Sequence, residues 1–195
     1  LKKNIIMLGA GGHAKVILDI AKLTGIKITH IVDIKEKLDP LFYGLKHITS
    51  DNNITNNLHP KESYCINALG VIPGKSKLLR STIYAKYIRN NYIFIKMIHP
   101  SAIISPNVTV ESGVNIMAGA IIQTGSIIKQ NSIINTGVLI DHDCQIEKDV
   151  HIAPGAVLCG NVKVGKKTFI GAGAKVLPNT IIPNNSIIPA GSLLK

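Results

Sequence analysis

The chain has 195 residues, is 46% hydrophobic and carries 22 Lys and Arg against 11 Asp and Glu, a formal net charge of +11. Residues 1–101 hold 15 basic and 6 acidic residues (net +9), whereas residues 102–195 hold 7 and 5 (net +2). The basic residues stand singly and aromatic residues make up only 4% of the chain, so platforms for base stacking are scarce. We therefore expect no nucleic-acid partner, and we interpret the charge as a solvated surface or as attraction for a phosphate-bearing small molecule.

The cysteines and the apolar runs indicate the compartment. Cys65, Cys144 and Cys159 are odd in number and lack metal-ligand spacing, which favours free thiols in a reducing cytoplasm over a disulfide framework. No apolar run approaches transmembrane length, and the first residues pass directly into a glycine turn, unlike a signal peptide. The sequence therefore predicts a cytoplasmic protein with no integral membrane segment.

The first part of the chain has the pattern strand, glycine turn, helix and strand. Residues 4–8 (NIIML) form a short apolar run, and residues 9–13 (GAGGH) supply the turn. A helix closed by Gly25 follows. Its predicted apolar face consists of Val16, Ile17, Ile20 and Leu23. Residues 27–32 (KITHIV) predict a second strand that ends at Asp33, which completes a βαβ unit.

The glycine turn has two interpretations. Gly11 and Gly12 let the backbone approach a ligand closely, and the start of the helix offers unpaired N–H groups to a phosphate. An acid at the end of the second strand, here Asp33, is where a ribose or base donor is usually bound. The last glycine of the dinucleotide fingerprint is missing, so a purely structural turn is the alternative to a nucleotide-type ligand.

The rest of the first half is short. It predicts a strand over 64–69 that ends at Gly70, a helix over 77–90 and a strand over 93–98 that leads into the second half. A full six-stranded Rossmann domain does not fit into this length. We therefore predict a small Rossmann-like α/β domain over residues 1–100 that binds one nucleotide.

Residues 102–195 repeat with a period of six. The third place of each hexad is aliphatic sixteen times in phase, from Ile104 to Leu194, and the first place is small or β-branched. On a strand, places one and three point to the same side and place two points outward, while Gly, Pro, Asn and Asp at places four to six form a turn. Three hexads would make one coil of a triangular prism, with coils stacked about 4.8 Å apart. Ordinary sandwich strands would not keep this phase, so we predict a stacked β-helix over residues 101–195.

One hexad of the repeat, V-L-I-D-H-D, carries candidate chemistry. It places His142 at a corner of the prism between Asp141 and Asp143. A carboxylate on Nδ1–H raises the basicity of the ring and leaves Nε2 to take a proton from a hydroxyl or an amine. Eighteen residues later, one coil further along the same edge, Gly160 has no side chain, so a thioester could approach and its carbonyl oxygen could accept the Gly160 N–H. The alternative for an isolated D-H-D is a solvated polar corner.

Two further polar residues remain open at this point. His151 stands at an outward second place, where a surface histidine is the alternative to a site residue. Asn135, seven residues before His142, either binds the acceptor or caps its own turn, and spacing does not decide between these roles.

Several of these features together resemble one branch of the hexapeptide acyltransferases. They are the 9–13 turn, Asp33, the junction 98–106 (IHPSAIISP), the D-H-D corner, His151 and residues 159–162 (CGNV). The branch comprises sugar acetyltransferases of the sialic-acid O-acetyltransferase type and includes UDP-4-amino-sugar N-acetyltransferases of bacillosamine and related bacterial surface glycans. The resemblance implies a left-handed parallel β-helix, a hand that the period itself does not determine.

The resemblance also implies roles for residues and partners. The chain would be a homotrimer with active sites between columns, using acetyl-CoA and a nucleotide-sugar by direct transfer, without an acyl-enzyme and without a metal. His142 would be the general base and Asp143 the group that raises its basicity. The acetyl-CoA site would be lined by His151, Gly160, Ala172 and Ala190. The nucleotide-sugar would be held by Gly11, Gly12, His13, Asp33, Gly70 and Asn135.

Other functions remain as alternatives. Paired acids are frequent after the second strand of the UDP-sugar enzymes, whereas this chain has Asp33 followed by Ile34, which weakens the assignment of uridine. We favour N-acetylation of a nucleotide amino-sugar over O-acetylation of a sialic-acid-like sugar, because a basic glycine-turn domain suits an acceptor that carries a diphosphate. A non-catalytic nucleotide-binding or scaffold protein is an alternative of another class. A zinc hydratase needs three histidines, including an H-x4-H pair. It is disfavoured because His142 and His151 are nine residues apart and the sequence has no such pair.

Overall fold

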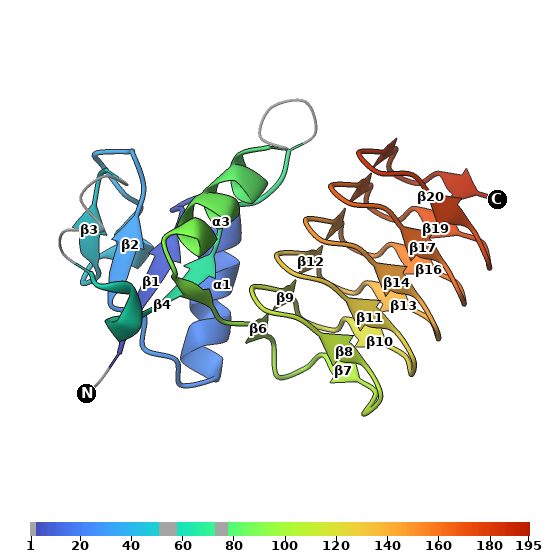
Figure 1. The fold of residues 1–195 in the computed structure, drawn as a ribbon, viewed down its shortest axis with the longest axis horizontal. Helices are drawn as coiled ribbons and strands as arrows, with labels where there is room; N and C mark the ends of the chain where they lie inside the picture. Colours follow the sequence, from blue (N-terminus) through green and yellow to red (C-terminus); the bar gives the residue numbers. More distant parts are fainter. Residues whose placement is uncertain (1–2, 51–57, 73–77) are drawn as a thin grey trace.

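The computed structural model describes residues 3–50, 58–72 and 78–195. Its first part is a parallel five-stranded sheet with the strand order β3-β2-β1-β4-β5 (Figure 1). We call this part, with its helices, the N-terminal sheet. Its elements are β1 Asn4–Leu8, α1 Gly12–Leu23, β2 His30–Val32, η1 Pro40–Phe42, β3 Lys46–Ile48, η3 Pro60–Glu62, β4 Ser63–Asn67, α3 Leu79–Arg89 and β5 Ile93–Phe94.

The central strand of this sheet is apolar on both faces because each face is covered by a helix. Met7 packs into a cluster with Ile17 and Ile20 of α1, whereas Ile6 and Leu8 pack into a second cluster that includes Tyr87 of α3. Alternate residues of a strand point to opposite faces, so α1 and α3 cover opposite sides of β1. The short apolar run predicted at residues 4–8 therefore lies in the middle of the sheet.

The observed elements correct several predictions for this part. Val16 and Leu23 are 41% and 61% exposed instead of lying on the buried face of α1, which Ala14, Leu18 and Ala21 complete. The second strand begins only at His30, and the strand predicted over 64–69 is observed over 63–67. The helix predicted over 77–90 is observed over 79–89, and residue 77 lies outside the described residues.

The strand predicted over residues 93–98 is in fact two strands in two different sheets. β5 pairs with β4 in the N-terminal sheet, whereas β6 (Met97–Ile98) pairs with β9 of the repeat. The apolar pattern continues through the junction because both ends of the segment are buried, and periodicity alone does not reveal the change of sheet. The division into domains 1–100 and 101–195 stays a prediction.

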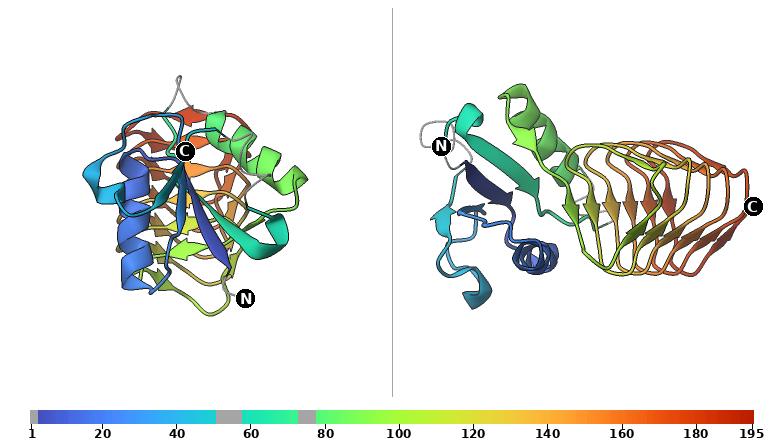
Figure 2. Two further views of the ribbon diagram at one scale, coloured as in Figure 1. Left: turned by 90° about the vertical axis from the view of Figure 1, so that its left-hand side faces the viewer. Right: turned by 90° about the horizontal axis from the view of Figure 1, so that it is seen from below.

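The repeat forms a column of three parallel sheets that extends away from the N-terminal sheet (Figures 1 and 2). The first sheet contains β7 Ile103–Ile104, β10 Ile121–Ile122, β13 Leu139–Ile140, β16 Val157–Leu158, β19 Lys175–Val176 and β22 Leu193–Leu194. The second contains β8 Thr109–Val110, β11 Ile127–Ile128, β14 Gln145–Ile146, β17 Lys163–Val164 and β20 Ile181–Ile182. The third contains β6, β9 Asn115–Ile116, β12 Ile133–Ile134, β15 His151–Ile152, β18 Phe169–Ile170 and β21 Ile187–Ile188.

The pairing register confirms the predicted coil of eighteen residues. Leu139 of β13 pairs with Ile121 on one side and with Val157 on the other. First and third places of the hexads form the core of the column, with Val138 and Ile140 as examples. The sixth place of every hexad from Gly113 to Gly191 has a φ between 57° and 75°. This left-handed conformation explains why Gly, Asn or Asp occupies all but one of these places.

One outward face of the column is buried from β6 to β15, because the N-terminal sheet packs against it, whereas Ile187 of β21 on the same face is exposed. Met97, Met117 and Ile133 share a buried cluster with Ile17 of α1. His151, on the same face, is only 8% exposed. The alternative of a surface histidine at this outward place is therefore wrong: the place points away from the axis of the column but into the contact with the N-terminal sheet.

Two further findings concern the described residues. The three cysteines are free thiols. Among the parts of the chain that the structure describes, we find no helix that is both long enough and apolar enough to span a membrane.

Candidate active site

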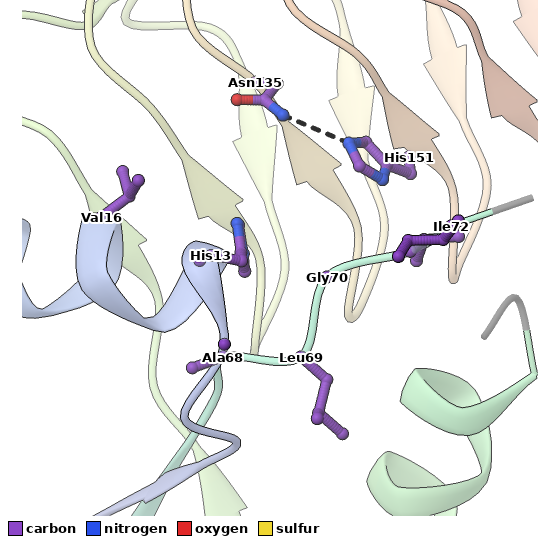
Figure 3. A pocket seen from close by; sticks show the side chains of 11 residues that line it. His13, Val16, Ala68, Leu69, Gly70, Ile72, Asn135 and His151 are labelled. Carbon is purple, nitrogen blue, oxygen red and sulfur yellow. Dashed lines mark hydrogen bonds between the residues drawn. The ribbon is translucent and has the colours of Figure 1, made fainter. Parts of the chain in front are cut away.

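A cleft of about 480 Å³ lies where the N-terminal sheet meets the column (Figure 3). We call it the first cleft. Three segments line it: the start of α1, the segment that follows β4, and the column. The lining residues are Gly11, Gly12, His13, Val16, Ala68, Leu69, Gly70, Val71, Ile72, Asn135 and His151. The structure thus brings together five of the six residues predicted to bind the nucleotide-sugar, and it adds His151 to them.

The glycine turn leaves the start of α1 open towards a ligand. Gly11 is the N-cap residue and supplies no side-chain cap, and the first turn contains no acidic residue. The first N–H groups of a helix lack partners within the helix, and they carry the positive end of its dipole. A phosphate beside Gly11 and Gly12 would satisfy both conditions.

His13 is a neutral hydrogen-bonding group of the first cleft. Its Nε2 lies 3.2 Å from Nδ2 of Asn115, an outward residue of β9. Burial, followed by the nearby charge of Arg80 and by His151, lowers the pKa of His13 to about 3. The ring is therefore unprotonated at neutral pH, and because an amide Nδ2 only donates, Nε2 of His13 is the acceptor.

His151 has the same character and keeps one free polar atom. Its Nε2 lies 3.3 Å from Nδ2 of Asn135, and its ring packs edge-on against Phe169. Burial and the charge of Arg80 lower its pKa to about 3. Since Nε2 accepts from the amide of Asn135, the proton stays on Nδ1, which is buried and has no hydrogen-bond partner among the described residues. His151 therefore holds a spare donor beside the first cleft.

Asp33, the sixth residue predicted to bind the nucleotide-sugar, lies in a neighbouring cleft of about 290 Å³. We call this the second cleft; it has an apolar lining from Leu8, Val32 and Ile83, and it shares the wall residue Leu69 with the first. The carboxylate of Asp33 accepts from the N–H of Ala10 at 2.7 Å and of Lys35 at 2.9 Å. These bonds fix the carboxylate at the carboxyl end of β2, next to the glycine turn.

His142 stands at a different corner, between β13 and β14, and its ring is exposed. Its Nδ1 is 2.9 Å from Oδ2 of Asp143, and its backbone N–H donates to Asp141. The hydrogen bond to Asp143, followed by the charge of Asp141, raises the pKa of His142 above its ordinary value. This corner therefore holds a basic imidazole with Nε2 available, the opposite of the two histidines in the first cleft.

Two glycines make room for this corner. A Cβ on Gly160 would lie 2.6 Å from Nε2 of His142, so the ring rests directly on the glycine one coil further along. A Cβ on Gly125, one coil earlier, would lie 2.3 Å from Oδ1 of Asp143. Side chains at these two places would displace the imidazole or its carboxylate.

The four residues predicted to line the acetyl-CoA site do not meet within one chain. Gly160 lies at the corner of His142, and His151 lies in the first cleft. Ala172 and Ala190 stand, exposed, at the corner that follows β18 and β21, further along the edge of Asn135. One side of the prism, the face of β13, separates the corner of Asn135 from the corner of His142.

Sequence reasoning missed the polar residues that join the two parts. Asn67, Arg80, Asn115 and Asn131 are all buried at this contact. No local signal marks them, because Arg80 lies in a helix that reads as a basic surface and Asn115 occupies an ordinary outward place. The one available signal was the polar Asn115 at an outward place of the repeat, and it indicates a buried contact only once it is known that the N-terminal sheet covers this face. Among the described residues, no three His, Cys, Asp or Glu side chains gather closely enough to hold a metal.

The fold and these corners define a hexapeptide-repeat acyltransferase with an α/β domain in front of its column. Residues 4–84 match the family model described as the PglD N-terminal domain, and residues 94–191 match the GMPPB C-terminal domain.

Solved structures agree over the full length. Perosamine N-acetyltransferase from Caulobacter crescentus, solved as a histidine variant with CoA and GDP-perosamine, is 31% identical with a TM-score of 0.89, over 100% of this chain and 90% of that chain. The acetyltransferase domain of PglB from Neisseria gonorrhoeae FA1090 is 30% identical with a TM-score of 0.87, over 99% and 91%. The same domain is also known in complex with acetyl coenzyme A, at 29% identity with a TM-score of 0.85, over 100% and 93%.

The chain therefore belongs to the family of sugar acetyltransferases that combine a PglD-type N-terminal domain with a hexapeptide-repeat domain. The protein is an acetyltransferase, and its column is a left-handed parallel β-helix. The family, fold class and enzyme class predicted from the sequence are thereby confirmed.

Proposed function

We propose that this protein transfers the acetyl group of acetyl-CoA to the amine of a nucleotide-activated amino-sugar. The observation that carries the proposal is the pair of adjoining clefts at the glycine turn, in a chain about 30% identical over its length to N-acetyltransferases of this type. One of those relatives is known with CoA and a GDP-linked amino-sugar, and another with acetyl coenzyme A.

The two clefts suit the two ends of such an acceptor. The apolar second cleft, with Asp33 at its edge, takes the nucleoside, and the carboxylate accepts from a ribose or base group. The diphosphate lies at the start of α1 beside Gly11 and Gly12. The sugar then occupies the first cleft, where His13, Asn135 and Gly70 surround it. The two clefts adjoin at the shared wall residue Leu69.

His142 is the general base of the transfer. Its Nε2 takes a proton from the sugar ammonium, and the neutral amine attacks the thioester carbonyl of acetyl-CoA. The N–H of Gly160 stabilises the negative oxygen of the tetrahedral intermediate. The intermediate collapses with cleavage of the C–S bond: the nitrogen loses a second proton to become the amide, and the CoA thiolate leaves and takes up a proton. The proton held by His142 passes to solvent, and no acyl-enzyme forms. Asp143 supports this role because it holds the protonated ring.

His151 is unsuited to act as the base. With a pKa of about 3, its ring is a very weak proton acceptor at neutral pH. It instead lines the first cleft as a neutral ring and accepts a hydrogen bond from Asn135. Contacts of acetyl-CoA with Gly160, Ala172 and Ala190 stay predictions.

The active protein is a homotrimer. The first cleft and His142 lie at different corners of one column, so an acceptor bound in one chain needs the base of another. The face between these corners carries four outward apolar residues in a row: Ile103 and Leu139 are 63% and 40% exposed, and Ile121 and Val157 are partly buried. The exposed Lys175 then separates this row from Leu193. Isolated apolar residues are common at surfaces, but four neighbouring apolar residues on one face favour an interface.

A mixing experiment tests this arrangement. His142→Ala removes the base, and His13→Gln alters the first cleft, so each variant alone should be nearly inactive. In trimers formed by coexpression of both, random mixing restores about a quarter of the sites, because each intact site takes its cleft from one chain and its base from another. Wild-type mass by light scattering should correspond to three chains. A monomer, or no gain on mixing, would contradict the trimer.

The acceptor is identified by a turnover assay. Acetyl-CoA is offered with UDP-, GDP-, CMP- and dTDP-linked 4-amino-sugars and with free sialic acids, and thiol release is measured. We expect release with one class of nucleotide amino-sugar and its loss in His142→Ala. Thiol release with sialic acids alone would indicate O-acetylation. If neither the wild type nor the variant releases thiol with any acceptor, the enzymatic proposal is wrong.

A further inference from the structure

Arg80 is an unusual feature of the contact between the N-terminal sheet and the column. It lies in the first turn of α3 and is only 2% exposed, although guanidinium groups are rarely buried without partners. Nη1 donates to the carbonyl oxygens of Asn67 and Leu69, both at 2.7 Å, and Nε donates to the carbonyl of Asn131 at 3.1 Å. One side chain thus holds backbone from both parts.

The segments that Arg80 joins form a wall of the first cleft. Asn67 and Leu69 lead directly into Gly70, which lines the cleft, and Asn131 belongs to the turn between β11 and β12 of the column. The side chain of Asn67 reinforces the joint, because its Nδ2 donates to the carbonyl of Arg80 and to Oδ1 of Asn131. Asn115 donates to the carbonyl of Asn67 and lies beside His13.

The charge of Arg80 acts on the same cleft. Burial lowers the pKa of Arg80 to about 9, while Asp149 and Tyr84 oppose this change, so the group remains a cation at neutral pH. Its charge helps to keep both His13 and His151 unprotonated. None of the described residues that line the first cleft is acidic. The cleft therefore presents neutral hydrogen-bonding groups above a buried positive charge.

We propose that Arg80 is a positioning residue for the acceptor sugar. Its guanidinium fixes the 67–70 wall of the first cleft against the column and keeps His13 and His151 as neutral hydrogen-bonding groups. A buried positive charge near the cleft makes a bound ammonium give up its proton to His142 more readily, which yields the free amine that attacks the thioester. This inference rests on the proposed function, because it assigns the sugar to the first cleft.

The test compares Arg80→Met and Arg80→Lys with Arg89→Met, an exposed arginine of the same helix. In Arg80→Met we expect the KM for the nucleotide amino-sugar to rise about tenfold, with the KM for acetyl-CoA changed less than about twofold. Arg80→Lys keeps the charge but loses the fork that reaches three carbonyls, so it also raises the acceptor KM, by a smaller factor. Arg89→Met should match the wild type.

A second readout does not depend on turnover. The ring signals of His13 and His151 are followed by NMR in the resting protein. At pH 4 the protonated fraction should be about a tenth in the wild type, should be higher in Arg80→Met, and should stay low in Arg80→Lys. A wild type inactive towards all nucleotide amino-sugars would refute the proposed function, while these signals still test Arg80.

Two results would overturn the role of Arg80. One is a folded Arg80→Met protein with unchanged acceptor KM and unchanged histidine protonation. The other, decisive if Arg80→Met does not fold, is an Arg80→Lys protein whose acceptor KM equals that of the wild type, because loss of the three-carbonyl fork would then have no effect on the cleft.

Discussion

The corner at His142 and the first cleft use the same side chain in opposite ways. His142 is exposed and hydrogen-bonded to a carboxylate, which raises its pKa, whereas His13 and His151 are buried near Arg80, which together with burial lowers theirs to about 3. A single chain thus holds one imidazole prepared to take a proton and two that remain neutral. The difference shows that environment, not residue type, decides whether the pKa of a histidine is raised or lowered.

The largest effect is expected when the histidine at the corner, His142, is removed. Removing the base in His142→Ala should lower kcat by about 10²- to 10⁴-fold, the usual contribution of general base catalysis, with little change in thermal stability because the ring is exposed. Steady-state kinetics and a melting curve measure both effects. His59→Ala, which removes another exposed histidine outside either site, serves as the matched control. Retention of more than about a tenth of kcat in His142→Ala would argue against a general base at this corner.

A smaller effect on activity is expected when His142 is kept and only its environment is changed. Asp143→Asn removes the carboxylate that raises its pKa. Because the base must be unprotonated, activity rises with pH through this pKa, so the acidic limb of the profile should move to lower pH in the variant. The plateau should fall on the order of 10- to 100-fold, since the ring is then a weaker base.

The pH profile of kcat/KM measures this change. Asp141→Asn is the matched control, because Asp141 acts on the ring by charge without a side-chain hydrogen bond to it, and it should shift the limb less. An Asp143→Asn limb that stays in place would show that another group titrates there.

The smallest effect concerns the buried pair and appears in stability. The folded-state pKa values of His13 and His151 lie near 3, below the ordinary value of 6.5. Between these values the unfolded chain binds more protons, so stability is complete above about pH 6.5 and is lost as the pH falls towards 3. Each ring contributes a slope of up to about 1.4 kcal/mol per pH unit.

Urea unfolding at several pH values between 4 and 7 measures this slope. The doubly substituted protein His13→Gln and His151→Gln should show a shallower dependence, because neither ring remains to be protonated. His142→Ala should not flatten it, since that ring is exposed and its pKa is raised. An identical slope in the double variant would show that carboxylates elsewhere cause the acid sensitivity.

The prediction from sequence was strongest where contacts repeat at a constant interval. The phase of the hexads predicted the register of eighteen residues, and with it the closeness of His142 to Gly160. It was weakest at the junction, where the strand expected over 93–98 divides between two sheets, and on the helix, where Val16 and Leu23 are exposed. At these places the sequence pattern indicates that a residue is apolar, but it does not indicate which part of the structure, if any, buries that residue.

The sequence by itself determined the column and its basic corner, because strand stacking relates residues i and i+18 and a carboxylate stands next to the imidazole. Only the tertiary structure decided which outward face of the column is buried, and hence that His13, Asn135 and His151 line one cleft near Arg80. The bond between Asn115 and His13 spans 102 residues and depends on how the N-terminal sheet docks on the column. Docking of this kind follows from the packing of two surfaces, which no local period encodes.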